Sequence, residues 1–98
     1  MTDKGILPPP DGFHGPVKRS VTIAGHETSI SLEPVFWAAL EAEAAARTLP
    51  LNALIAEIDA LRILADPPPN LASALRSWLL ATKMRITRNS VDSANDSQ

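Results

Sequence analysis

Two short runs of alternating residues contain the side chains best suited to hydrogen bonding and charge contacts with a partner. They are residues 18–23 (KRSVTI) and 27–32 (ETSISL). Ser20, Thr22, Ser29 and Ser31 form a row of hydroxyl groups, which can both donate and accept hydrogen bonds. Lys18 and Arg19 add two positive charges beside them. Such a row suits contact with bases and phosphates of a nucleic acid, and it equally suits the solvated face of a sheet.

The alternation itself predicts two β-strands. β-branched and apolar residues recur at every second position, so each strand has one apolar and one polar face. Gly25 lies between the runs and supplies the positive φ that a tight turn needs. A hairpin and a single bent strand both fit this pattern.

A first helix is predicted over residues 33–47. Pro34 suits an early helical position, where its missing N–H costs nothing. Phe36, Leu40 and Ala44 recur at a spacing of four and form an apolar stripe.

Two further helices are predicted beyond it. Pro50 ends the first helix and opens a second one, residues 50–64, whose apolar face is wide enough to contact more than one neighbour. Residues 66–69 (DPPP) then interrupt the chain. Asn70 is a good N-cap for a third helix over residues 71–86.

The two ends differ from this central part, residues 18–88. Residues 1–17 are rich in proline and glycine, which predicts a flexible arm. Residues 89–98 are polar and without periodicity, which predicts a disordered tail. The 98 residues suggest one domain with a modest core, and a chain of this size commonly completes its core by oligomerising.

Catalytic and metal-binding patterns are missing from the sequence. There is no cysteine, and His14 and His26 lack the spacing of a zinc site. Glu41 and Glu43 are two positions apart, so on a helix they point in different directions. Nothing places a nucleophile beside a base. We therefore expect no enzymatic activity and no cofactor.

Charge and hydropathy indicate where the protein is located and which kinds of partner it can bind. No secretory signal and no run of ~20 apolar residues occurs, which favours a cytoplasmic protein without a membrane anchor. The net charge of −2 is unhelpful for a nucleic-acid binder, but the charges are segregated. Residues 33–65 carry five acidic and two basic side chains, whereas residues 71–88 carry four basic ones and no acidic one.

The order of strand, helix, turn and helix resembles the ribbon-helix-helix family, the class of the Arc and MetJ repressors. The resemblance rests on Ser29-Ile30-Ser31-Leu32, on Phe36 and Leu40, and on residues 50–55 (PLNALI). With KRSVTIAGHETSISLEPVFWAAL, LNALIAEID and NLASALR, the chain looks closer still to a bacterial subgroup of small stand-alone proteins with an added C-terminal helix. The match covers about residues 18–80. It implies a mainly α fold with a short β ribbon, formed as an intertwined homodimer.

The resemblance also implies a DNA-binding set. In the family, the strand before the first helix pairs with its twin, and its polar side chains enter the major groove of double-stranded DNA. The start of the second helix contacts a phosphate through backbone N–H groups and a small polar cap. By position, the set is Lys18, Arg19, Glu27, Ser29, Ser31, Leu51 and Asn52.

Two functions follow from these patterns. The first is a homodimeric DNA-binding transcriptional regulator. The second is a protein-interaction module, or an antitoxin-like partner, that has lost specific DNA binding and contacts a protein through the N-terminal arm or the third helix. Glu27, the proline in place of a cap hydroxyl at Pro50, and the negative net charge favour the second.

Overall fold

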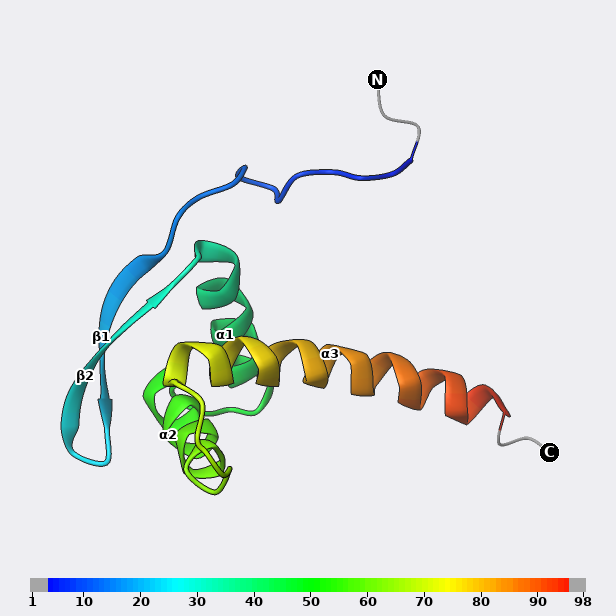
Figure 1. Cartoon of the computed structure of the whole chain (residues 1–98). Helices are drawn as coiled ribbons and strands as arrows, with labels where there is room; N and C mark the ends of the chain where they lie inside the picture. The colour runs from blue at the N-terminus through cyan, green and yellow to red at the C-terminus, as the bar shows by residue number, and fades with distance from the viewer. Residues whose placement is uncertain (1–3, 96–98) are drawn as a thin grey trace.

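The protein folds as a two-stranded β hairpin packed on three helices. The structure is a computed structural model that describes the backbone of residues 4–95 and the side chains of residues 4–85. The elements follow in the order β1 (Val17–Ile23), β2 (His26–Leu32), α1 (Pro34–Ala46), α2 (Leu51–Arg62) and α3 (Leu71–Asn95). The hairpin lies on one side of the helices, and the later part of α3 extends away from them (Figure 1). The predicted short β ribbon with helices behind it and an extra C-terminal helix is confirmed.

The two strands form a hairpin and not one bent strand. They pair in antiparallel register, with Ile23 opposite His26 beside the turn. Ala24 and Gly25 make the turn, with φ angles of 51° and 81°. Positive φ at both central residues is the type I′ geometry, whose twist matches the twist of the flanking strands. Gly25 adopts that backbone without steric cost, which is why the chain can fold back here.

A Schellman motif ends α1. The N–H of Leu49 donates to the carbonyl of Ala44 at 2.9 Å, and the N–H of Thr48 donates to that of Ala45 at 3.1 Å. Thr48 holds the left-handed position of this motif, with a φ of 55°. A β-branched residue is strained in that conformation, whereas glycine adopts it freely.

The third helix starts at the predicted cap and ends later than predicted. Asn70 Oδ1 accepts a hydrogen bond from the N–H of Ser73 at 2.8 Å. The helix then continues to Asn95, beyond the predicted end at residue 86. The tail predicted to be disordered from residue 89 is therefore helical through Asn95, and residues 96–98 lie outside the described part. No proline or glycine follows Asn70, so the chain lacks the residues that most often end a helix.

The core is built within one chain. Leu32, Leu40, Ile55 and Leu75 are completely buried, one each from β2, α1, α2 and α3, and Val21 of β1 is 5% exposed. The apolar face of the hairpin is thus covered by helices that follow it in the same chain.

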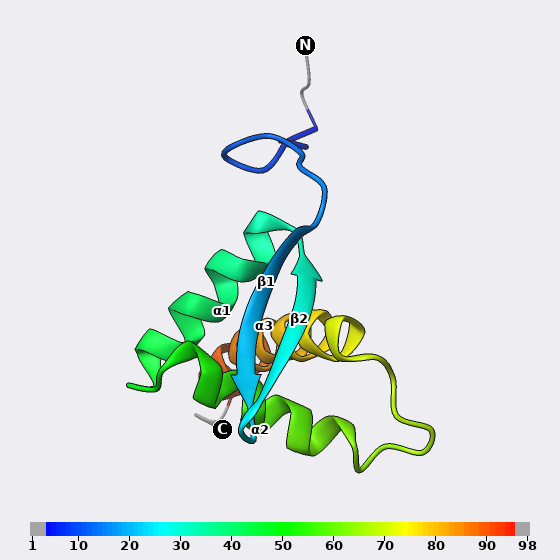
Figure 2. The same cartoon turned by 90° about the vertical axis from the view of Figure 1, so that its left-hand side faces the viewer.

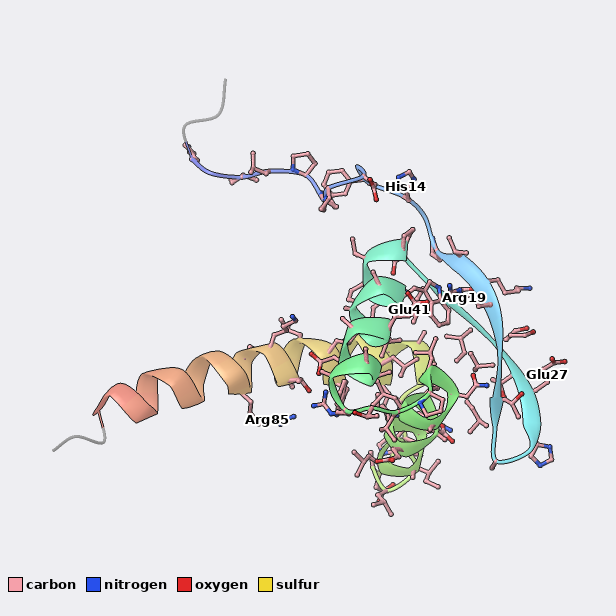
Figure 3. All side chains as sticks on the ribbon, turned by 180° about the vertical axis from the view of Figure 1, so that it is seen from behind. His14, Arg19, Glu27, Glu41 and Arg85 are labelled. Atoms are coloured by element: carbon pink, nitrogen blue, oxygen red, sulfur yellow. The ribbon has the colours of Figure 1, made fainter. Side chains whose placement is uncertain are left out.

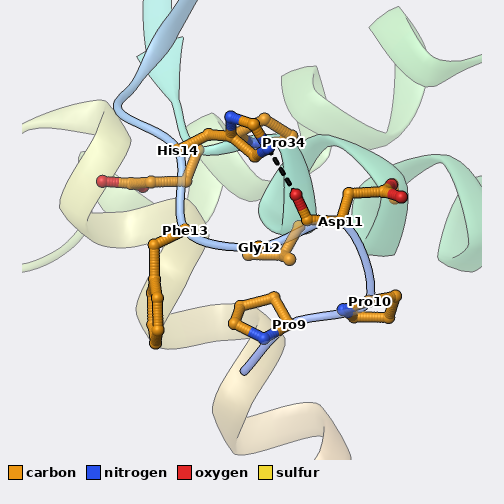
Figure 4. A pocket seen from close by; sticks show the side chains of 10 residues that line it. Pro9, Pro10, Asp11, Gly12, Phe13, His14 and Pro34 are labelled. Atoms are coloured by element: carbon orange, nitrogen blue, oxygen red, sulfur yellow. Dashed lines mark hydrogen bonds between the residues drawn. The ribbon is translucent and has the colours of Figure 1, made fainter. Parts of the chain in front are cut away.

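The N-terminal arm passes the start of α1. Residues 5–9 and 12–16 form neither helix nor strand, and a tight turn lies between them. Pro9 and Phe13 of the arm, with Pro34 of α1, line an apolar pocket of about 320 Å³ (Figure 4). His14 Nε2 donates to the carbonyl of Asp11 at 2.6 Å and closes this part of the arm.

Candidate nucleic-acid interface

The outer face of the hairpin is a continuous polar surface. Three cross-strand pairs share it, and they are Lys18 with Ser31, Ser20 with Ser29, and Thr22 with Glu27. All six side chains belong to exposed residues. The hairpin stands in front of the helices, so this face has no other element over it (Figure 2). Glu27, Ser29 and Ser31 therefore share one surface, and β1 adds two hydroxyls and a lysine to it.

Arg19 lies on the opposite face from Lys18. Successive residues of a strand point to opposite sides, and Arg19 shares the side of the apolar residues. Its Nη1 is 3.1 Å from Glu41 Oε2 of α1, and its guanidinium carbon is 4.8 Å from the centre of the Trp37 ring. Figure 3 shows Arg19 beside Glu41, with Glu27 further along the hairpin. The structure thus separates the two neighbouring cations, and only Lys18 stays on the polar face.

Trp37 fixes the start of β1 on α1. Its indole Nε1 donates to the carbonyl of Val17 at 2.9 Å, and its side chain is almost completely buried. The guanidinium of Arg19 lies over the same ring in a cation–π contact. Trp37 directly follows Phe36 of the apolar stripe, and nothing in that pattern indicated a contact with the strand. Helical periodicity identifies which residues are buried, and it does not identify their distant partners.

Ion pairs neutralise most of the arginines in the described part of the chain. The pairs are Arg19–Glu41, Arg47–Glu43, Arg62–Asp59 and Arg76–Glu33. Three of these guanidinium groups also lie over aromatic rings, those of Trp37, Trp78 and Phe36. These arginines hold elements together, so their charges are less available to phosphates than the sequence suggested.

The remaining cations of the described part lie at three places, one of which is Lys4 in the N-terminal arm. Lys18 is exposed on the hairpin, and Lys83 and Arg85 are exposed on α3 beyond its packed part. Within residues 4–85, none of these cations takes part in an ion pair; Arg85 has a long hydrogen bond of 3.4 Å to Thr82 Oγ1. The side chain of Arg88 lies outside the described residues.

The start of α2 leaves backbone N–H groups without an intrahelical partner. Pro50 is the N-cap residue and makes no side-chain cap bond, and the first intrahelical donors are Ala53 and Leu54. The N–H groups of Leu51 and Asn52 therefore lie in the unpaired first turn. Leu51 is half-buried and Asn52 is exposed.

The start of α2 is not beside the tip of the hairpin. A depression at the tip is lined by Ile23 and Ala24 with Asp59 and Arg62, which belong to the last turn of α2. Asn52 lies at the other end of this helix, which at 12 residues is ~18 Å long. The structure thus brings Glu27, Ser29, Ser31 and Lys18 onto one surface and places Leu51 and Asn52 at the end of α2 that is away from the hairpin tip.

Two other structural features are absent from the described residues. In residues 4–85, whose side chains are placed, no three histidine or acidic side chains lie close enough together to hold a metal ion. Across the described helices, none is long and apolar enough to cross a membrane.

Comparison with known proteins identifies the type of domain. A family model described as a ribbon-helix-helix domain matches residues 16–82, which is more than half of the chain and includes the hairpin, α1, α2 and the packed part of α3. A search of the curated proteins found no match. A search of the solved structures found none either.

Proposed function

This chain belongs to the ribbon-helix-helix family, and we propose from that premise that it is a homodimeric DNA-binding regulator of transcription. It reads the major groove with the outer face of its hairpin. Domains of this family are typically regulatory and not enzymatic, and we propose no catalytic role for this chain.

The observation that carries the proposal is the exposed polar face of the hairpin. Its four hydroxyls can each donate to or accept from a base edge, which allows contact with any of the four bases. Two strands ~4.8 Å apart fit a major groove ~12 Å wide. Glu27 at the end of this face can accept a hydrogen bond from the N4 amino group of cytosine, so it favours particular sequences over others.

Backbone contact comes from a small number of cations. Lys18 at the edge of the hairpin and the exposed pair Lys83 and Arg85 on α3 are the candidates for phosphate contact. Two copies in a homodimer double this set, which offsets the modest charge of each chain. The free N–H groups at the start of α2 offer a further anion site.

The test is a binding titration with double-stranded genomic fragments at low and moderate salt. We expect binding at about 50 mM salt that weakens steeply by about 200 mM, because released counterions drive the association. A single-stranded fragment of the same length is the control and should bind more weakly. No measurable binding at low salt would show that the proposal is wrong.

The pairing of the arginines and the acidic residue on the polar face favour a second function. Four arginines are paired with carboxylates, and the polar face carries the acidic Glu27. A protein-interaction module, with the arm or α3 as the contact, is consistent with both facts. A pull-down with and without residues 1–17 distinguishes a DNA-binding regulator, which keeps its DNA affinity without the arm, from an interaction module that uses the arm, which loses its partner.

A further inference from the structure

We infer that the apolar pocket between the N-terminal arm and the start of α1 binds residues 4–7 (KGIL) of a second copy of the chain. The contact lies outside the hairpin. It does not depend on the proposed DNA binding, so it can be tested in the absence of DNA.

The pocket has apolar walls that are open to a partner. Pro9 and Phe13 of the arm form one side, and Pro34 and Val35 of α1 form the other (Figure 4). Phe13 is 84% exposed and Val35 is 46% exposed. The volume of about 320 Å³ is at the lower end of the range of ~300–1,000 Å³ found for ligand pockets, so the pocket suits one or two side chains and not a whole helix.

A tight turn in the arm holds one wall of this pocket in place. The N–H of Gly12 donates to the carbonyl of Pro9 at 2.8 Å, and Gly12 has a φ of 83°. Pro10, Asp11 and Gly12 form a Pro-Asp-Gly sequence, which is typical of such turns. The wall is therefore made by hydrogen bonds of the chain itself, and the pocket is formed before a partner binds.

The segment 4–7 matches the pocket in polarity and in charge. Its apolar side chains, Ile6 and Leu7, are 73% and 78% exposed. Lys4 is an exposed cation at the start of the segment, and Asp11 is a carboxylate at the pocket. Within residues 4–85, neither Lys4 nor Asp11 takes part in an ion pair. Each charge is thus available to the other between two copies.

The segment is directed away from the pocket of its own chain. Pro8, Pro9 and Pro10 follow it, and consecutive prolines form a stiff, extended helix of ~3.1 Å per residue. Leu7 precedes a proline and is therefore restricted to extended backbone as well. The first residues of the arm run away from the helices (Figure 1). Because Pro9 is itself a wall of the pocket, the segment is presented to a second copy.

Disulfide formation between two different variants tests this contact. The chain has no cysteine of its own, so every disulfide comes from introduced residues. Full chains with Ile6→Cys are mixed with full chains with Val35→Cys under mild oxidation, and mass spectrometry follows the mixed disulfide. Glu57→Cys, at an exposed position of α2, replaces Val35→Cys in the matched control.

We expect the mixed disulfide with Val35→Cys to form about tenfold faster than the one with Glu57→Cys, because binding raises the effective concentration of the two thiols. Equal rates in the two mixtures would overturn the inference. Ala38→Cys, at another exposed position of the same pocket, serves as a second variant if Val35→Cys does not fold.

A charge exchange tests the identity of the bound segment. Lys4→Glu in the Ile6→Cys chain, or Asp11→Lys in the Val35→Cys chain, should slow the mixed disulfide by about threefold, as expected for an exposed ion pair. The two exchanged chains mixed together should regain the original rate. A rate that stays low in that mixture would contradict the assigned occupant.

The double variant Ile6→Cys/Val35→Cys distinguishes a second copy from the chain itself. We expect its disulfides to join separate chains, so that dilution suppresses them. A disulfide within one chain, formed at a rate independent of dilution, would show that the segment occupies its own pocket and would overturn the inference.

Discussion

Arg76 of α3 donates two hydrogen bonds to Glu33 Oε1, from Nε at 3.1 Å and from Nη2 at 2.9 Å. Glu33 is the residue between β2 and α1, where it holds the N-cap position of the helix. The guanidinium carbon of Arg76 also lies 5.4 Å from the centre of the Phe36 ring. One side chain thus connects the third helix with the junction between the ribbon and the first helix.

Replacing Glu33 should change how stability depends on pH. The backbone N–H of Glu33, and then the guanidinium of Arg76, hold the pKa of this carboxyl below its ordinary value of 4.5. A lowered folded-state pKa means that the contribution to stability is present above pH 4.5 and is lost as the pH falls below it. Urea unfolding at pH 7 and pH 3 should therefore show a smaller loss of stability on acidification for Glu33→Gln than for the unaltered chain.

Glu57→Gln is the matched control for that measurement. Glu57 is exposed on α2, and its replacement should leave the acid dependence of unfolding unchanged. An equal loss of stability in Glu33→Gln and the unaltered chain between the two pH values would contradict the assigned role of the pair with Arg76.

Trp37→Phe should lower the stability of the domain. The substitution removes the donor for the Val17 carbonyl and leaves a gap in a site that is 4% exposed. Loss of one hydrogen bond and partial loss of packing together cost about 1–3 kcal/mol. Chemical denaturation measures the change. Trp78→Phe is the comparison, because Trp78 is half-buried and its replacement should lower the free energy of unfolding by less. A larger loss of stability in Trp78→Phe than in Trp37→Phe would argue against the anchoring role of Trp37.

Thr48→Gly should raise stability. Thr48 has a φ of 55°, a conformation that glycine accepts without strain. Relief of this strain, less the added chain entropy of glycine, leaves a gain of about 0.5–1 kcal/mol. Thermal unfolding should show a higher midpoint. Ala42→Gly, at an exposed position inside α1, is expected to have the opposite sign at about 1 kcal/mol, since glycine disfavours a regular helix. The same sign for both variants would contradict this account of the helix end.

Lys18→Ala and Arg19→Ala should separate DNA contact from fold stability. Lys18 lies on the outer face, so its removal should weaken DNA binding and reduce the slope of log affinity against log salt by about 1 per chain. Arg19 pairs with Glu41 on the other face, and its removal should lower the free energy of unfolding by less than about 1 kcal/mol, with the salt slope unchanged. A change of slope in Arg19→Ala alone would reverse the assignment of the two faces.

Local patterns in the sequence determined a large part of the fold. Alternation over residues 18–32 predicted two strands with apolar inner faces, and the structure has them over Val17–Ile23 and His26–Leu32. The helix starts at Pro34 and Leu71 follow from a proline tolerated early in a helix and from the cap at Asn70. These signals act over a few residues, so they can be read without knowing the fold. The end of α3 was misplaced because its tail is polar but contains no residue that stops a helix.

The tertiary structure decided which residues separated along the chain meet. Nothing in the neighbourhood of Arg19 or Arg76 indicates that their partners are Glu41 and Glu33, 22 and 43 positions away. Those choices depend on how the hairpin and three helices pack, since long-range contacts form only where burial of the apolar faces brings the chain together. The same packing places Lys18 and Arg19 on opposite faces and covers the apolar side of the ribbon within one chain. The sequence by itself thus determined the elements and their apolar faces, and the tertiary structure decided which charges remain for a partner.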